Sequence, residues 1–550
     1  MIDHPITEPN MTSSRIPVLI IGAGLAGLTA ALLLARRGVP ALLVERRVST
    51  SRHPRARGVN LRSLELLRTV DGLETELRQA ARAGAGEFSI IVAESVTGRE
   101  IETLLSPGMF DTSWLSPSAN CHAGQDRVEP ILLRHARRLG ADIRFGTELV
   151  SFTQGGDSVR ALLRDRASGA EYGVEAQYMV AADGNRSPVR KALGIATEGK
   201  GTLSHNLSIL FRAELDTVLK GSGFYLYYLQ NPAFTGAFVS TDDADIGQVS
   251  LEYDPLTEDA ATYDATRCAG LVRAALGTPD LAIDVLDVMP WEMSAQLATR
   301  MAEGRIFLAG DAAHTMPPTG GLGGQTAMQD AADLAWKLAL VLQGQAGPAL
   351  LGTYEAERRP VATLTVARQT ANYVERMRPD RSELTEPDTE ADYLSVAMGY
   401  RYRSAAILSA ADDNGKATET PLNPTGQPGT RLAHIPLQRG GEAVSTIDLV
   451  GGRFLLLAGA EAEAWAAAAE RVARKLGLDL AVERVGSALA DPAGGLAARA
   501  GLTAQGALLV RPDGYVAWRS LVAEADPARI LETALTGILC RGMTAASWAA

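Results

Sequence analysis

A glycine-rich turn between two apolar segments constrains the fold of this chain more than any other feature. Residues 18–46 read VLIIGAGLAGLTAALLLARRGVPALLVER. An apolar run leads into Gly22, Gly24 and Gly27, an uncharged helical stretch follows, and a second apolar run ends at Glu45. This order is typical of a strand, a tight turn, a helix and a second strand, and it predicts a dinucleotide-binding unit.

The glycines and the start of the helix have distinct tasks in such a unit. Gly22 permits the tight turn, Gly24 lets the backbone approach a pyrophosphate, and Gly27 lets the helix lie close to the strand. Leu25 and Ala26 begin the helix, where free N–H groups and the positive end of the helix dipole favour phosphate. We therefore expect all five residues to bind the cofactor.

An acidic residue closes the unit. Glu45 stands at the end of the second strand, where its carboxylate can accept hydrogen bonds from ribose hydroxyls. Arg46 follows directly and either reaches the adenosine or lies in solvent. Both are candidate cofactor residues.

The same span has a second interpretation. No charged residue occurs from Val18 to Ala35, which is the length and apolarity of a membrane span or a signal peptide. The three glycines, the flanking strand patterns and the lack of a small-residue cleavage site argue against both. We therefore expect no membrane association.

Composition narrows the classes of protein and partner. A chain of 550 residues is too long for one core, and we expect two or three domains behind a flexible tail at residues 1–15. The net charge of −11 disfavours nucleic acid and anionic membranes as partners. The three cysteines (Cys121, Cys268 and Cys540) have neither disulfide nor zinc spacing. These features predict a cytoplasmic protein without a metal site, and they leave a homo-oligomer open.

Two later segments can complete the nucleotide site. In YMVAADGNRSPVRKALG a strand runs into Asp183, which is either a turn residue or a site residue. In GRIFLAGDAAHTMPPTGGLGGQTAMQD a strand ends at Asp311, and a loop rich in proline and glycine precedes a long helix. Such a loop can bring bare backbone N–H groups against a flat ring or an anion. Its candidate cofactor residues are Pro318, Gly320, Gly323 and Gly324.

The three motifs, in this order and spacing, resemble the group A flavoprotein aromatic hydroxylases, whose fold is typified by p-hydroxybenzoate hydroxylase. The resemblance covers about residues 16–345. It implies that the glycine turn and Glu45 hold the ADP half of FAD, and that Asp311 holds the ribitol and pyrophosphate. It also implies that residues 317–324 border the isoalloxazine, and that the segment from Asp183 to Arg190 supports FAD and could also contact the nicotinamide cofactor. Two further residues match the family. Arg55 lies in its Pro-Arg-Ala segment, within HPRARGVNLRSLELL, and Gln125, in QDRVEPIL, matches a glutamine that contacts the flavin.

The resemblance also implies the fold and the reaction. The fold expected is α/β, with a discontinuous Rossmann-like FAD-binding domain at residues 16–195 and 296–400. NADPH or NADH would reduce FAD, and O₂ would then give a flavin hydroperoxide that hydroxylates an aromatic ring. The segments GKGTLSHNLSILFRAEL, FYLYYLQNPAF and VSLEYDP look most like bacterial aromatic-polyketide hydroxylases that act on anthracyclinones and angucyclinones.

The middle and the C-terminal third have their own patterns. Residues 196–295 alternate apolar and polar in short runs, which predicts an antiparallel sheet roofing a substrate pocket. Proline and glycine cluster within residues 401–430, the expected linker. Residues 431–550 read as strand, alanine-rich helix, strand and a hairpin turning at Asp513-Gly514, which resembles the thioredoxin-like domain of phenol hydroxylases. The C-x-x-C redox motif is absent, so a structural or oligomerisation role is expected.

Four residues are candidates for catalysis. Tyr227 and Tyr228 lie on a predicted strand of the roof, and because adjacent strand residues point to opposite faces, at most one is expected to face the pocket. Arg401 and Arg403, in GYRYRS, resemble a family segment with a prominent arginine and could stabilise a phenolate. The alternative is that these arginines make salt bridges at a domain junction.

Three other functions remain in view. A fourth, a flavin-dependent halogenase, is discounted, because it would carry a W-x-W-x-I-P segment and no two tryptophans here are two residues apart. A Baeyer–Villiger oxygenase and a hydroxylase of a simpler phenol would share the same motifs. Outside enzymes, the alternative is a flavin-binding carrier without turnover, which substrate-stimulated NAD(P)H oxidation would distinguish.

Overall fold

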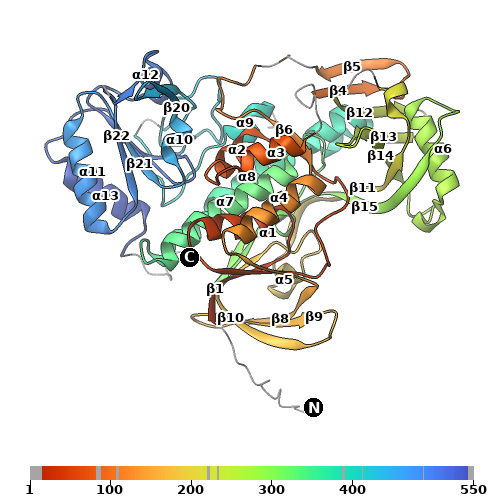
Figure 1. The fold of residues 1–550 in the computed structure, drawn as a ribbon, viewed down its shortest axis with the longest axis horizontal. Helices are drawn as coiled ribbons and strands as arrows, with labels where there is room; N and C mark the ends of the chain where they lie inside the picture. The colour runs from red at the N-terminus through yellow and green to blue at the C-terminus, as the bar shows by residue number, and fades with distance from the viewer. Residues whose placement is uncertain are drawn as a thin grey trace, which may run out of the picture.

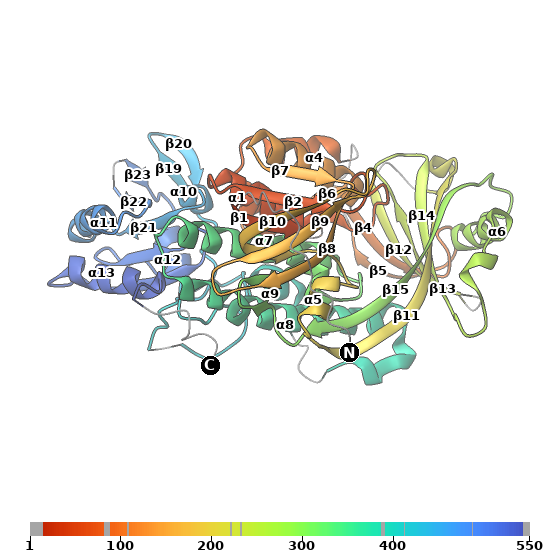
Figure 2. The same ribbon diagram turned by 90° about the horizontal axis from the view of Figure 1, so that it is seen from below.

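The computed structural model describes residues 15–81, 88–106, 109, 111–219, 223–231, 234–386, 391–411, 413–486 and 488–542. The predicted tail lies outside these residues except for Arg15, which begins the first strand. Three domains lie in a row, with the domain of the glycine turn between a β-sheet domain and the C-terminal domain (Figures 1 and 2). Within the described residues, no helix is both long and apolar enough to cross a membrane.

The central domain is built on a parallel sheet whose inner strands are largely buried on both faces. Its strand order is β17-β10-β1-β2-β7, and every neighbouring pair in this run is parallel. Buried parallel strands need nearly continuous apolar sequence, which explains the runs around the glycine turn. The strands are β1 (Arg15–Ile21), β2 (Ala41–Glu45), β7 (Asp142–Phe145), β10 (Glu171–Ala181) and β17 (Ile306–Leu308), and the helices packed together beside them are α1 (Leu25–Arg36), α4 (Gln125–Arg138) and α7 (Gly323–Leu342).

Close backbone contacts explain two of the glycines. Gly22 has a φ of +102°, and a Cβ there would lie 2.3 Å from the carbonyl oxygen of Ala182. A Cβ on Gly27 would lie 1.9 Å from the carbonyl oxygen of Gly22. The turn, β10 and the first turn of α1 therefore approach one another as closely as only glycine allows.

The β-sheet domain presents two different faces. Its eight-stranded sheet has the order β18-β15-β11-β14-β13-β12-β4-β5 and is antiparallel except where β12 pairs with β4. One face packs on α6 (Ala265–Leu276), and the other faces α8 (Thr353–Met377) of the central domain. The strands are β4 (Phe88–Ala93), β5 (Glu100–Leu105), β11 (Thr197–Arg212), β12 (Phe224–Asn231), β13 (Phe234–Ser240), β14 (Ile246–Tyr253), β15 (Asp284–Ala298) and β18 (His314–Thr315). The sheet thus extends beyond the predicted range 196–295, because β4 and β5 come from residues 88–105 and β18 from residues 314–315, both within the ranges predicted for the FAD-binding domain.

The C-terminal domain has a four-stranded sheet of order β22-β21-β24-β25, with helices α11 and α13 packed together on it. The predicted strand–helix–strand–hairpin order is confirmed, and the elements are β21 (Phe454–Ala458), α11 (Glu463–Leu476), β22 (Leu480–Arg484), β24 (Ala507–Val510), β25 (Val516–Ser520) and α13 (Pro527–Ile538). The described part of residues 401–430 contains no helix or strand but packs closely, since Tyr402 and Ile407 are buried in one core with this domain.

Replacing Gly27 by alanine tests the close approach of α1 to the turn. Gly27→Ala should lower the free energy of unfolding of the apoprotein by roughly 3 kcal/mol or more, because the new Cβ overlaps a backbone oxygen. The matched control is Gly270→Ala in α6, where a Cβ would meet nothing within 4 Å and should add about 1 kcal/mol. Urea unfolding measures both, and equal effects would contradict the account.

Candidate active site

Three separated motifs meet at one edge of the central sheet. The strands β1, β10 and β17 are neighbours, so their carboxyl ends bring Gly22, Asp183 and Asp311 together. The backbone N–H of Ala182 donates to the carbonyl of Ile21 at 2.8 Å, and the N–H of Ala309 donates to Ala181 at 3.0 Å. Ligands of open parallel sheets bind at this edge.

The turn leaves space for a ligand at the start of α1. A Cβ on Gly24 would approach a single neighbouring atom, the Oε1 of Glu129, at 4.0 Å. Leu25 and Ala26 are buried in the first turn of α1, which has no side-chain cap. The carboxylate of Glu45 accepts from the N–H of Ala23 at 2.8 Å and so lies against the turn, as a ribose-binding acid should.

Arg46 lies on the surface directly after Glu45. Its side chain is exposed, and its carbonyl oxygen accepts from Arg166 at 2.8 Å. The structure therefore places the Arg46 guanidinium in solvent.

The Asp183 motif is tied to the Asp311 loop by Arg190, the arginine at its end. One carboxylate oxygen of Asp183 accepts from the N–H of Val189 at 3.1 Å, and the other is buried without a partner among the described residues. Burial raises the pKa of this carboxyl. Arg190 donates to the carbonyls of Ala312 at 2.7 Å and Asn185 at 3.1 Å. A buried carboxylate oxygen without a partner, beside an arginine that connects two loops, is typical of a ligand-binding site.

Arg55 and Gln125 lie near Glu129 of α4, whose carboxylate faces Gly24 of the turn. Gln125 accepts from the N–H of Ala56 at 3.2 Å and donates to Glu129 at 2.6 Å, which places it at the start of α4. Arg55 lies near both Glu129 and Asp311, whose charges act on it. Glu129 is buried, and it was missed although its spacing of four residues from Gln125 puts both on one helix face.

Asp311 follows the end of β17, and its side chain is exposed to solvent. Many protein atoms nevertheless surround the carboxyl, as they would in a cleft. This desolvation raises the pKa of the carboxyl, while His314 and Arg55 oppose part of the rise. A carboxylate at this position can accept a hydrogen bond from a ribitol hydroxyl.

The loop between Asp311 and α7 presents bare backbone. Pro318 is exposed, and Gly323 and Gly324 form the first turn of α7, which has no side-chain cap. A Cβ on Gly324 would lie 2.9 Å from Leu25, and one on Gly320 would lie 2.5 Å from the amide of Gln369. The loop is therefore fixed between α1 and α8, with the N-terminus of α7 facing the same edge as the other motifs.

These observations fit FAD. The open space beside Gly24, the unpartnered buried oxygen of Asp183 and the accessible carboxylate of Asp311 match the pyrophosphate and polyol of a dinucleotide. The flat ring would lie against the loop of residues 317–324.

The two tyrosines of β12 point to opposite faces of the sheet. Tyr227 packs with Phe238 in the core under α6, away from the central domain. Tyr228 packs with Tyr373 and Met293 on the face toward α8. The structure thus places Tyr227 on the face away from the expected pocket and leaves Tyr228 as the candidate. Strand alternation predicts that the two point to opposite faces but does not tell which one faces the pocket.

The sequence analysis expected Arg401 or Arg403 to lie where it could stabilise a phenolate. In the structure it is Arg376 of α8 that lies beside the candidate Tyr228. Its guanidinium lies 5.7 Å from the ring centre of Tyr228 and donates to the carbonyl of Thr319 in the glycine-rich loop. Burial raises the pKa of the Tyr228 phenol, and Arg376 opposes part of this rise. The phenol is therefore protonated at neutral pH and can donate a hydrogen bond.

Arg401 and Arg403 lie at the junction with the C-terminal domain. Arg401 lies 3.0 Å from Asp413, and Arg403 lies 2.9 Å from the same carboxylate. The other side-chain partners of both arginines also fall within residues 413–428. The structure does not bring them to the flavin motifs, and the salt-bridge interpretation describes their contacts.

Several buried side-chain atoms between the loop of residues 317–324 and the β-sheet domain lack a hydrogen-bond partner among the described residues. They are the Nε1 of Trp291, both amide atoms of Gln369 and the Oδ1 of Asn372. Trp291 lies on the sheet face toward α8, and the two amides lie against Gly320. A ligand with several oxygen substituents could satisfy such atoms.

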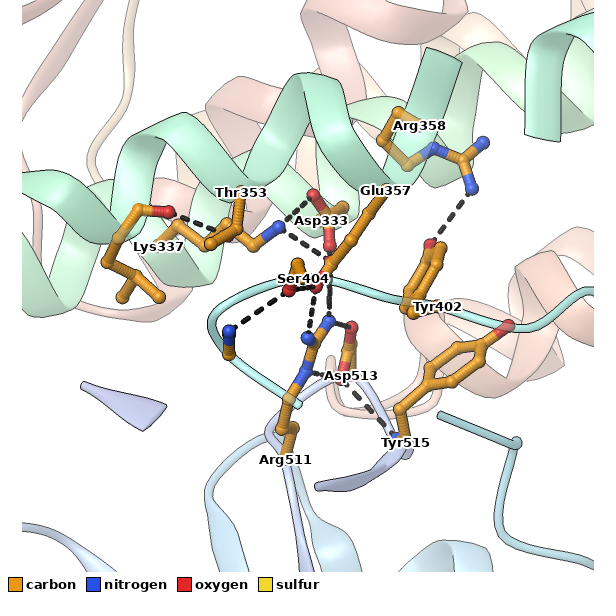
Figure 3. Close-up of polar contacts among 12 residues, drawn as sticks. Asp333, Lys337, Thr353, Glu357, Arg358, Tyr402, Ser404, Arg511, Asp513 and Tyr515 are labelled. Carbon is orange, nitrogen blue, oxygen red and sulfur yellow. Dashed lines mark hydrogen bonds and ion pairs between the residues drawn. The ribbon is translucent and has the colours of Figure 1, made fainter. Parts of the chain in front are cut away.

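Three buried carboxylates lie close together elsewhere, between the central and C-terminal domains. Among the described residues, oxygens of Asp333, Glu357 and Asp513 come within 4.8 Å of one another. Lys337 and Arg511 already pair with them at 2.5–2.8 Å (Figure 3). The cluster is therefore an ion-pair network, and its cations occupy the place that a metal ion would need.

Comparison with known proteins agrees with this geometry. The family model described as an FAD binding domain matches residues 15–369, and that of the C-terminal domain of aromatic-ring hydroxylases matches residues 425–541. Aklavinone 12-hydroxylase of Streptomyces purpurascens is 45% identical over 541 residues, covering 96% of this chain and 100% of that protein. A 4-methyl-5-nitrocatechol 5-monooxygenase of a Burkholderia species is 42% identical, covering 96% and 98%.

Solved structures show the same likeness. The crystal structure of aklavinone-11 hydroxylase with FAD and aklavinone superposes with a TM-score of 0.91 at 44% identity, covering 98% of this chain and 100% of that one. The fold and site thus define a flavoprotein monooxygenase. The chain belongs to the family of FAD-dependent aromatic-ring hydroxylases, and the predicted resemblance to the polyketide hydroxylases is confirmed.

Replacing Asp311 separates its roles in stability and binding. Its raised pKa means that the folded protein loses stability as pH rises and the carboxyl ionises. Apoprotein with Asp311→Asn should therefore be more stable than wild type at pH 7, with the difference vanishing below about pH 4. Its affinity for FAD should fall about tenfold.

Chemical unfolding at several pH values and titration with FAD measure these effects. The matched control is Asp71→Asn, a second exposed aspartate that lies outside the three flavin motifs, and it should change neither quantity. Unchanged FAD affinity in Asp311→Asn would remove this residue from the site.

Proposed function

We propose that this chain uses FAD, NAD(P)H and O₂ to hydroxylate a polycyclic aromatic polyketide. The observation that carries the proposal is the meeting of three flavin motifs at one sheet edge, opposite a sheet face that presents Tyr228 to Arg376. The similarity to aklavinone 12-hydroxylase and to the aklavinone-bound structure supports a polycyclic substrate.

The cofactor residues act by binding and orientation. The turn at Gly22, Gly24 and Gly27 would hold the pyrophosphate, Glu45 the ribose, and Asp311 the ribitol. Leu25 and Ala26 supply N–H groups at the start of α1. The remaining contacts would come from Arg55, Gln125, Asp183, Pro318, Gly320, Gly323 and Gly324. When bound, FAD supplies the transfer of two electrons from NAD(P)H to O₂.

The substrate residues hold the reacting ring. Tyr228 would donate a hydrogen bond to a phenol or quinone oxygen, and the guanidinium of Arg376 would stabilise negative charge on the ring oxygen as it develops. The sheet and α8 would exclude water from between them. In the balanced reaction one atom of O₂ replaces a ring hydrogen as hydroxyl, the other leaves as water, and NAD(P)H supplies two electrons.

A second substrate class has its own support. The 42% identity to a nitrocatechol monooxygenase over 96% of the chain favours a small substituted catechol as the alternative substrate. A Baeyer–Villiger oxygenation would use the same cofactor site but would insert oxygen beside a ketone.

Product analysis tests the proposal. Purified FAD-loaded enzyme is incubated with NADPH and an anthracyclinone, a substituted catechol or a polycyclic ketone, and NADPH oxidation and product mass are recorded. The proposal expects the anthracyclinone to accelerate oxidation and to gain one oxygen atom as a ring hydroxyl by NMR. Turnover of the catechol alone, a lactone product, or FAD binding without turnover would contradict it.

The adjacent tyrosines of β12 give a matched pair of variants. Tyr228→Phe should lower kcat for hydroxylation about tenfold to a hundredfold, because a donor to the ring oxygen is lost. Tyr227→Phe should leave kcat within about twofold, since Tyr227 faces α6. Steady-state kinetics with the accepted substrate measure both, and equal losses would contradict the assignment of the faces.

A further inference from the structure

A hairpin of the C-terminal domain inserts charged and aromatic side chains into the central domain. The turn between β24 and β25 carries Arg511, Asp513 and Tyr515, all of which are buried (Figure 3). Arg511 donates to Glu357 of α8 at 2.5 and 2.9 Å and to Asp513 at 2.5 Å. The hairpin is therefore held on α8 by fully desolvated ion pairs.

An aromatic stack leads from this hairpin to a buried arginine. The ring of Tyr515 stacks on Tyr402 with centres 4.1 Å apart. The hydroxyl of Tyr402 accepts from Arg358 at 3.0 Å (Figure 3). Arg358 has no exposed surface, so each of its N–H groups needs an acceptor within the protein.

Arg358 in turn fixes the residue that holds the loop at the end of β17. It donates to one oxygen of Asp330 at 2.8 Å. The second oxygen of Asp330 accepts from the backbone N–H of Gly310 at 3.1 Å and lies 2.7 Å from Nε2 of His314. Gly310 has a φ of +62°, and a Cβ there would lie 3.0 Å from Ala327 of α7. Asp330 therefore fixes the backbone conformation at Gly310, the residue directly before Asp311.

We propose that the C-terminal hairpin positions FAD through this chain of contacts: Tyr515 supports Tyr402, Tyr402 completes the partners of Arg358, and Arg358 holds Asp330 on the Gly310 amide. The side chains named are positioning residues, since none touches the cofactor itself. The inference rests on the proposed function only in that FAD is the cofactor, and it does not depend on the substrate.

Two conservative variants separate positioning from general stability. Tyr402→Phe keeps the stacked ring but removes one of the acceptors of Arg358, whereas Tyr515→Phe removes only a hydroxyl that donates to the carbonyl of Tyr400 at 3.3 Å. Tyr402→Phe should weaken FAD binding about tenfold, because a hydrogen bond to a buried charge is lost. Tyr515→Phe should stay within about twofold of wild type.

Two further readouts do not depend on turnover. In the apoprotein, amide hydrogen exchange in residues 310–313 should be faster in Tyr402→Phe and unchanged in Tyr515→Phe. At saturating FAD, the visible circular dichroism of the bound flavin should change in Tyr402→Phe alone. Tyr515→Leu removes the supporting ring and should resemble Tyr402→Phe, with the apoprotein melting temperature recorded as the control for folding.

The outcomes decide between the proposals. Equal FAD affinity, amide exchange and flavin dichroism in Tyr402→Phe and Tyr515→Phe would overturn the inference, even if Tyr515→Leu fails to fold. An effect of Tyr402→Phe without one of folded Tyr515→Leu would overturn the role of the hairpin. Wild-type protein that binds no FAD would instead overturn the proposed function.

Discussion

Ion pairs with no exposed surface hold the long helices of the central domain against the C-terminal hairpin. Lys337 of α7 pairs with Asp333 at 2.7 Å and with Glu357 of α8 at 2.8 Å, and Arg511 completes the set from the hairpin. Burial alone would raise the pKa of Glu357, but Arg511 and Lys337 outweigh it and hold this pKa below its usual range. Removing one partner from such a network typically costs about 3–5 kcal/mol, so the domains are expected to form one cooperative structure.

The local part of the fold could be predicted from sequence because its causes are local. The turn at Gly22 and Gly27, the strands around it and the hairpin at Asp513-Gly514 depend on backbone space and on short apolar runs, which a sequence displays directly. The order of the motifs also identified the family, which the comparisons confirm.

The rest depended on contacts between distant segments. Asp333 and Lys337 are four residues apart, a spacing typical of an exposed helix face, yet both are buried because α8 and the hairpin cover them. Arg376 stands in α8 without a motif around it, and only packing against the sheet brings it to Tyr228. Arg401, by contrast, lies in a conspicuous segment but pairs with Asp413.

The central claim is that one FAD site is assembled from separated motifs and reaches the C-terminal hairpin. Amide hydrogen exchange of the full chain with and without FAD tests it most directly. The account predicts slower exchange on binding in residues 22–27, 183–190 and 310–324, and also in the hairpin around Arg511. Slower exchange confined to residues 22–27, with the Asp311 loop and the hairpin unchanged, would contradict it.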